Sequence, residues 1–207
     1  MVLTKSVLLL GVLICGCQVA PPETDSKVEQ VTKAPVGEDP EVLLVKEIAS
    51  RFDKNKAEIT LLLLDLAIHK DDMEQTYFIG PCEPGLLGSG ILLYLVLGKE
   101  TTALRFRVDY LDNSWIGVVQ SFKIAANDYR WQSPPCAFRG NYLHQYFDIP
   151  ATANEIELAK KLDQAHGVVV RFQGSDGYRD KNPLVAAWKC EEILRLYELM
   201  GGKPQNE

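Results

Sequence analysis

Histidine is scarce in this 207-residue sequence, and its three histidines are not spaced to form a metal site. His69, His144 and His166 stand far apart, and neither a His-x-x-x-His nor a Cys-x-x-Cys pair occurs. Closely spaced pairs of this kind are what hold zinc in a preorganised geometry. We therefore expect no metal ion and no other cofactor.

The sequence also lacks the short motifs that commonly identify a catalytic site. Ser89 lies between Gly88 and Gly90, whereas a nucleophile elbow needs glycine two positions away on each side of the serine. No glycine-rich loop ends in Gly-Lys-Ser or Gly-Lys-Thr, the pattern that cradles nucleotide phosphates. These absences favour a protein that is not an enzyme and has no catalytic residues.

A basic excess is missing as well. The chain has 22 lysines and arginines against 28 aspartates and glutamates, a formal net charge of −6. Proteins that bind nucleic acid or anionic membrane surfaces through charge usually have a basic excess. We therefore expect no nucleic-acid partner, and any membrane attachment should have another source.

No apolar run approaches the roughly 20 residues that a membrane-spanning helix needs. Instead, Lys5 is followed by a short apolar run, Val7 to Ile14, and the composition becomes polar from Pro21 onward. A positive start, a short apolar segment and a small residue before a cut are typical of a secretory signal peptide. We expect residues 1–16 to be removed.

The end of this segment, Ile14, Cys15, Gly16 and Cys17, resembles the lipobox of bacterial lipoproteins. The resemblance implies diacylglyceryl transfer to the Cys17 thiol, cleavage after Gly16 and acylation of the new amino terminus, which together anchor a protein stably in a membrane. It also implies a cell-envelope location. Because Gln18 is not aspartate, this would be the outer membrane, facing the periplasm, if the source is Gram-negative. The alternative is an ordinary signal peptide that ends near Cys17.

The remaining chain is long enough for one domain. Residues 17–40 contain the lipidated cysteine and a polar, proline-broken stretch that predicts a flexible linker. Residues 41–200 predict a single domain, and residues 201–207 a short tail.

Three cysteines remain after the signal and the lipid site are set aside. Cys82 and Cys136 lie in proline-containing loops, in a compartment that permits disulfides, so a Cys82–Cys136 bond is one prediction. The other is that all three are separate thiols. Cys190 falls on the apolar face of a predicted helix, as expected of a small buried residue.

Periodicity and turn residues predict the elements of the domain. A helix should begin at the Asp39 cap and run to about residue 54, another should begin at the Thr152 capping box, and a last one should run from Pro183 to Met200. Glu58 to Ile68 is apolar on both faces, so strand and helix stay open, and residues 70–90 predict a loop. The predicted strands are residues 91–97, 104–111, 115–124, 129–132, 141–149 and 168–172.

These elements predict an α+β fold in which an antiparallel meander is covered by helices on one face. The strand predicted for residues 104–111 indicates that helices cover one face, because Leu104, Phe106, Val108 and Tyr110 alternate with more polar residues. One face of the sheet should therefore be dry and the other wet.

Four short segments are similar to a group of small bacterial envelope domains of unknown function. They are Leu104 to Tyr110 with its alternating basic residues, Trp115-Ile116, Asp148-Ile149-Pro150, and Val170 to Gly174. The similarity covers residues 41–199. It implies the same α+β fold and brings no activity with it.

Two sets of polar strand residues are candidate sites. Arg105, Arg107, Asp109 and Arg171 would form a basic strip for a small anionic ligand or an acidic envelope protein, if their strands are neighbours. Alternating charges that simply face water are the alternative.

His144, Tyr146 and Asp148 share one side of another predicted strand and could bind a ligand or a metal ion, or could only face water. Our first hypothesis is a lipid-anchored binding domain without catalytic activity. The others are an enzyme with a site assembled from His144, Asp148 and Arg171, and a structural or assembly factor of the envelope.

Overall fold

The computed structural model describes residues 39–82 and 88–203. The predicted signal peptide, Cys17, residues 17–38 of the predicted linker and residues 204–207 of the predicted tail lie outside these ranges. The helices are α1 (Pro40–Ala49), the 3-10 helix η1 (Asp53–Asn55), α2 (Lys56–Leu63), α3 (Ala153–Asp163) and α4 (Cys190–Leu199). The strands are β1 (Ala67–Asp71), β2 (Thr76–Gly80), β3 (Gly90–Leu97), β4 (Thr102–Leu111), β5 (Val119–Ala126), β6 (Tyr129–Gln132), β7 (Arg139–Gly140), β8 (His144–Pro150), β9 (Val168–Gly174), β10 (Gly177–Lys181) and β11 (Val185–Ala186). No helix within the described ranges is both long and apolar enough to cross a membrane.

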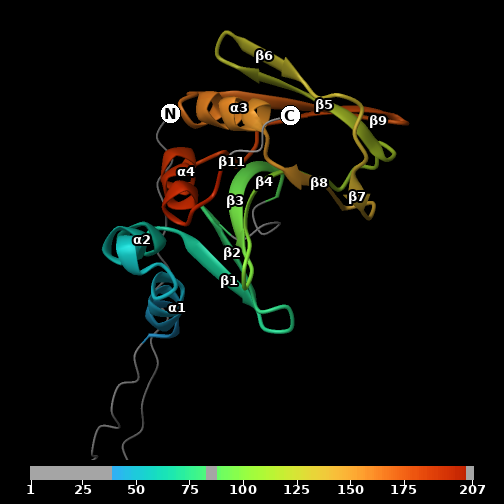
Figure 1. The fold of residues 1–207 in the computed structure, drawn as a ribbon. Helices are drawn as coiled ribbons and strands as arrows, with labels where there is room; N and C mark the ends of the chain where they lie inside the picture. The colour runs from blue at the N-terminus through green and yellow to red at the C-terminus, as the bar shows by residue number, and fades with distance from the viewer. Residues whose placement is uncertain (1–38, 83–87, 204–207) are drawn as a thin grey trace, which may run out of the picture. The chain divides into compact units, whose positions relative to one another are not determined.

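The domain is α+β, as predicted, but its strands form two sheets (Figure 1). Sheet A has the order β1-β2-β3-β4-β8-β7, with β11 added to β3 in parallel. Sheet B has the order β10-β9-β5-β6, and all of its pairs are antiparallel. The prediction of one continuous meander is therefore wrong, because β5 leaves the sheet that contains β3 and β4.

The connection between β4 and β5 explains the change of sheet. The side chain of Gln145, from β8, accepts a hydrogen bond from the Val119 backbone N–H (2.9 Å) and donates one to the Gly117 carbonyl (3.0 Å). On the other side, a Cβ on Gly174 would lie 2.0 Å from the Ile116 carbonyl oxygen, so only glycine lets β9 approach this closely. The incoming chain is thus held against β8 and β9, and β8 takes the place next to β4.

Helices cover the apolar face of sheet A. Leu104, Phe106, Val108 and Tyr110 of β4 are all buried, which confirms the predicted dry face. They belong to one core with residues from α1, α2, α3 and α4. Asp39 caps α1, and Thr152 and Glu155 form the predicted capping box of α3.

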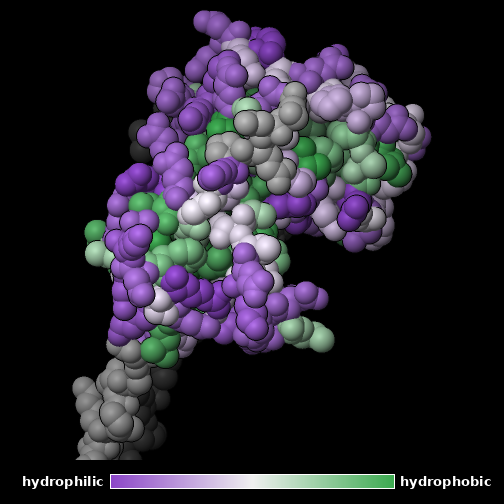
Figure 2. Space-filling model, in the orientation of Figure 1, coloured by the Kyte–Doolittle hydropathy of each residue, from purple (hydrophilic) through white to green (hydrophobic). Residues whose placement is uncertain are grey.

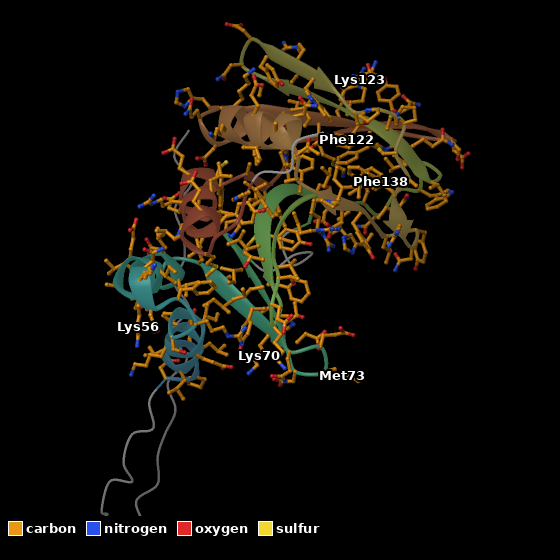
Figure 3. All side chains as sticks on the ribbon, in the orientation of Figure 1. Lys56, Lys70, Met73, Phe122, Lys123 and Phe138 are labelled. Atoms are coloured by element: carbon orange, nitrogen blue, oxygen red, sulfur yellow. The ribbon has the colours of Figure 1, made fainter. Side chains whose placement is uncertain are left out.

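Aromatic side chains fill the core where sheets A and B meet. The ring of Phe122, from β5, lies 6.0 Å from Phe138, 6.1 Å from Phe147 and 6.4 Å from Phe172, measured between centroids. Figure 3 shows Phe122 and Phe138 between the two sheets. Offset and edge-on rings of this kind add stability beyond the area they bury.

The ambiguous segment from Glu58 to Ile68 is divided between two elements. Its first part is in α2, where Ile59 and Leu63 are buried one turn apart while Leu61 is 69% exposed. Its last residues begin β1, which forms a hairpin with β2. The loop predicted for residues 70–90 is therefore wrong over β2.

The last helix is shorter than predicted. Leu184 and Ala187 donate backbone hydrogen bonds to the carbonyls of Ser89 and Ile91, at the start of β3, so β11 occupies the predicted first turn. Ala187 and Lys189 then adopt left-handed backbone angles (φ 56° and 54°), and α4 begins only at Cys190. Leu184, which precedes β11, is 62% exposed.

The predicted disulfide is absent, and Cys82, Cys136 and Cys190 are free thiols. Cys82 packs against a small apolar cluster of Leu92, Tyr94 and Val185. Cys136 instead packs against the main core. The two thiols pack against different clusters, and no disulfide joins them. Cys190 is buried as predicted, and burial raises the pKa of its thiol to about 12, with a further contribution from Asp163.

Candidate functional site

The face of sheet A opposite the helices is polar where β3, β4 and β8 run side by side. Strand register places Arg107 opposite Asp148, Asp109 opposite Tyr146, and Arg105 opposite Tyr94, so all of these side chains share one face. We call this set the polar face of sheet A: Tyr94, Arg105, Arg107, Asp109, His144, Tyr146 and Asp148. Figure 2 shows strongly hydrophilic residues over the region that β4 and β8 occupy in Figure 1.

Asp109 is at the centre of a buried ion network. Its exposed fraction is only 1%, so the prediction of a water-facing side chain is wrong at this position. The Arg107 guanidinium donates to both carboxylate oxygens, through Nε (2.9 Å to Oδ2) and Nη2 (2.8 Å to Oδ1). His144 Nε2 lies 2.7 Å from Oδ1. The carboxylate is therefore fully surrounded by protein groups.

Both carboxylate oxygens of Asp148 also accept hydrogen bonds from protein side chains. Tyr94 donates its hydroxyl hydrogen to Oδ2 (2.6 Å), and Arg105 donates from Nε to Oδ1 (2.9 Å). Burial, together with the Asp148 hydrogen bond, raises the pKa of Tyr94 well above its usual range. Tyr94 is thus a hydrogen-bond donor at neutral pH and fixes the carboxylate between β3 and β4.

A pocket of about 580 Å³ opens beside this network. Three arginines line it: Arg105 and Arg107 from β4, and Arg139 from β7, which register places opposite Tyr146. The Arg107 guanidinium lies over the Tyr146 ring, 4.4 Å from its centroid, which fixes its plane. No hydrogen bond or ion pair joins the Arg139 side chain to any other residue in the described ranges.

The structure brings together most of the predicted site residues. Arg105, Arg107 and Asp109 adjoin His144, Tyr146 and Asp148, and the prediction that the last three share one side of a strand is confirmed. Arg171 is elsewhere, because β9 belongs to sheet B, where its side chain is paired with Asp180. The strip that included Arg171 is therefore wrong, and so is the set His144, Asp148 and Arg171.

Tyr94 and Arg139 both line the pocket, and neither was predicted as a site residue. Tyr94 is the one residue with a hydroxyl group in the apolar run from Ile91 to Leu97, and this could have indicated a site residue. Arg139 follows a proline-containing loop, and nothing in the local pattern indicates that it turns toward β8.

The site offers hydrogen-bond donors rather than metal ligands. No group of three His, Cys, Asp or Glu side chains within residues 39–82 and 88–203 could hold a metal ion. Guanidinium groups beside aromatic rings are instead suited to carboxylate or phosphate groups attached to a ring.

No family model, curated protein or solved structure that was compared with the chain matches it.

Proposed function

We propose that this protein is a lipid-anchored cell-envelope protein whose domain binds a small anionic ligand in the pocket of sheet A and does not act as an enzyme. The observation that supports an anionic ligand is that the pocket has unused hydrogen-bond donors but no unused carboxylates. The acidic side chains at the pocket are occupied by protein partners, whereas the arginines keep donors that protein groups do not use.

Counting the donors makes this imbalance concrete. A guanidinium has five N–H donors. Arg105 contacts Asp148 through Nε and Nη2, which leaves its Nη1. The nearest acid to Arg107 Nη1 is Asp148, at 3.9 Å, which is beyond hydrogen-bond distance. With Arg139 included, the arginines exceed the two aspartates by one positive charge, so the pocket favours an anion.

Burial of the network is a second support. Burying an ion pair such as Arg107–Asp109 is seldom more stabilising than packing apolar residues in its place. It does hold the guanidinium groups in fixed positions before a ligand arrives, which lowers the entropy lost on binding.

The lining also limits the size and type of ligand. A volume of about 580 Å³ is within the usual range for small-molecule sites. The rings of Phe78, Tyr94 and Tyr146 line it beside the arginines. The ligand class that fits is a small carboxylate or phosphate carrying a flat ring, of either aromatic or sugar type.

A binding experiment with defined probes tests the pocket. The detergent-extracted full chain is titrated calorimetrically with benzoate, phenyl phosphate and glucuronate, and with benzamide and glucose as uncharged controls. We expect at least one anion to bind and the uncharged compounds not to. Arg139→Gln should weaken that binding about tenfold, because it removes one charge-assisted hydrogen bond. The matched variant Arg179→Gln, on an exposed position of β10, should not. Equal binding by both variants, or by none of the anions, would contradict the proposal.

The anchor is tested separately by the intact mass of membrane-extracted protein. We expect the wild type to begin at Cys17 with added acyl mass, and Cys17→Ala to lack it. An unlipidated, soluble wild type would instead support the ordinary signal peptide.

One observation favours an enzyme as the second candidate. The buried Asp109 holds His144 in a fixed orientation, as acids do for histidines that transfer protons. If the pocket is catalytic, the bound anion should be consumed over time, and His144→Gln should stop the reaction while leaving binding intact.

A further inference from the structure

The outer face of sheet B is the side that points away from the aromatic core. In β5, Phe122 and Ile124 are buried, whereas Lys123 between them is exposed. Figure 3 shows Lys123 at the upper strands, with Phe122 on the side that faces the interior. The alternation of β5 thus places a lysine on an open sheet surface.

Strand register sets like charges against each other on this face. Lys123 lies directly opposite Arg171 of β9, and like charges in this position destabilise a sheet. Asp180 of β10 offsets one of them, because its carboxylate accepts from Arg171 Nε and Nη2 at 2.6 Å each. The Lys123 side chain has no hydrogen bond or ion pair with any residue in the part of the chain that the structure describes.

A hollow of about 340 Å³ adjoins Lys123. It exists because Ala125, the next outward residue of β5, lies between Arg130 of β6 and Val169 of β9. The small side chain leaves a notch between two longer ones. Val169, which is 41% exposed, and Ala125 form the apolar part of the hollow. Lys123, Arg130 and Arg171 form its basic part.

We infer that this hollow binds an amphiphilic anion, a carboxylate or phosphate attached to an apolar chain. The anionic group would lie between Lys123 and Arg130, where it relieves the repulsion between Lys123 and Arg171. The apolar chain would cover Ala125 and Val169. The three cations exceed Asp180 by two charges, in a chain whose formal net charge is −6. This site uses none of the residues of the polar face of sheet A and does not depend on the function proposed for it.

NMR titration of the full chain with octanoate tests the inference. Acetate, octyl phosphate and inorganic phosphate are titrated in parallel to separate the chain from the charge. Lys123→Gln removes the unpaired charge, and Ala125→Ile fills the notch without changing charge, in a position where a β-branched residue suits the strand. Lys99→Gln, in the exposed turn after β3, is the control.

We expect octanoate or octyl phosphate to shift the amides of β5, β6 and β9, and acetate and inorganic phosphate to bind at least about tenfold more weakly. Lys123→Gln and Ala125→Ile should each weaken binding by a similar factor, whereas Lys99→Gln should not. If acetate binds as tightly as octanoate, or if the two sheet B variants bind like the wild type, the inference is wrong. Shifts confined to β3, β4 and β8 would likewise overturn it while leaving the pocket of sheet A intact.

Discussion

Strands β4 and β9 have nearly the same sequence pattern and opposite environments. Each places an arginine between two buried apolar residues, Arg107 between Phe106 and Val108, and Arg171 between Val170 and Phe172. In β4 the charged side is enclosed, and Asp109 is 1% exposed. In β9 the corresponding pair, Arg171 with Asp180, is nearly half exposed on both side chains.

The difference comes from what lies beside each strand. β4 is the fourth strand of its sheet, and β3 and β8 place Tyr94, His144 and Tyr146 around its charges. β9 has neighbours on both sides too, and they contribute Lys123, Asp180 and the Tyr178 ring beside Arg171, yet the Arg171 and Asp180 side chains stay nearly half exposed. The same alternation therefore produces a preorganised network in one sheet and a solvated ion pair in the other.

Replacing the aspartate of each pair should give the largest difference in the free energy of unfolding between the two environments. Asp109→Asn leaves the Arg107 guanidinium largely buried without its counter-charge, and we expect it to lower the free energy of unfolding by about 3 kcal/mol. Asp180→Asn should have a far smaller effect, because water replaces the lost contact. Urea denaturation of both variants measures this, and equal losses would mean that the two ion pairs do not differ in environment.

The thiol of Cys82 reports on the charge of Asp109. Burial raises the pKa of Cys82, and the negative charge of Asp109 raises it further. Asp109→Asn should therefore increase the rate of Cys82 alkylation by iodoacetamide, measured by peptide mass spectrometry under native conditions. Cys136, whose thiol pKa is raised mainly by burial, is the internal control. A parallel increase at both thiols would indicate general opening of the fold and not a local charge effect.

Acid should remove the contribution of the exposed pair. The hydrogen bond from Arg171 lowers the pKa of Asp180. A carboxylate whose pKa is lowered by folding stabilises the protein above its unfolded pKa, and this contribution is lost as the pH falls below about 4. The difference between wild type and Asp180→Asn should thus shrink from about pH 7 to about pH 3. A difference that stays constant over this range would mean that the Asp180 carboxylate is not the group responsible.

Salt should change the stability of these variants least, and it should again affect the exposed pair more than the buried one. At about 1 M NaCl, ions screen the Arg171–Asp180 pair, so the stability difference of Asp180→Asn should nearly disappear. The loss caused by Asp109→Asn should change little, because salt does not reach a carboxylate that is 1% exposed. Repeating the urea series in salt checks this, and an equally large salt effect on Asp109→Asn would show that solvent enters the network.

Much of the local structure could be predicted, because it depends on neighbouring residues. Asp39 followed by Pro40, and Thr152 with Glu155, predicted the starts of α1 and α3, since a cap acts within one helical turn. The secondary structure of the run from Glu58 to Ile68 could not be predicted from its pattern, because both of its possible faces are apolar. The packing of Ile59 and Leu63 against the core decided that a helix forms there.

The polar face of sheet A shows where local reasoning stops. Alternation assigned Arg105, Arg107 and Asp109 to one side of β4, and His144, Tyr146 and Asp148 to one side of β8. Whether the two strands were neighbours depended on pairing across more than 30 positions of the chain, through the Gln145 contacts that direct β5 into sheet B. That pairing also explains why Arg171 was wrongly grouped with them.

The sequence by itself determined the α+β class, the caps, and which side chains share a strand face, because these follow from backbone geometry and from the period of apolar residues. Only the tertiary structure decided that there are two sheets, that Cys82 and Cys136 lie in different clusters, and that one set of charges is enclosed while the other meets water. The physical reason is that burial and ion pairing depend on contacts between distant segments, which a local pattern does not encode.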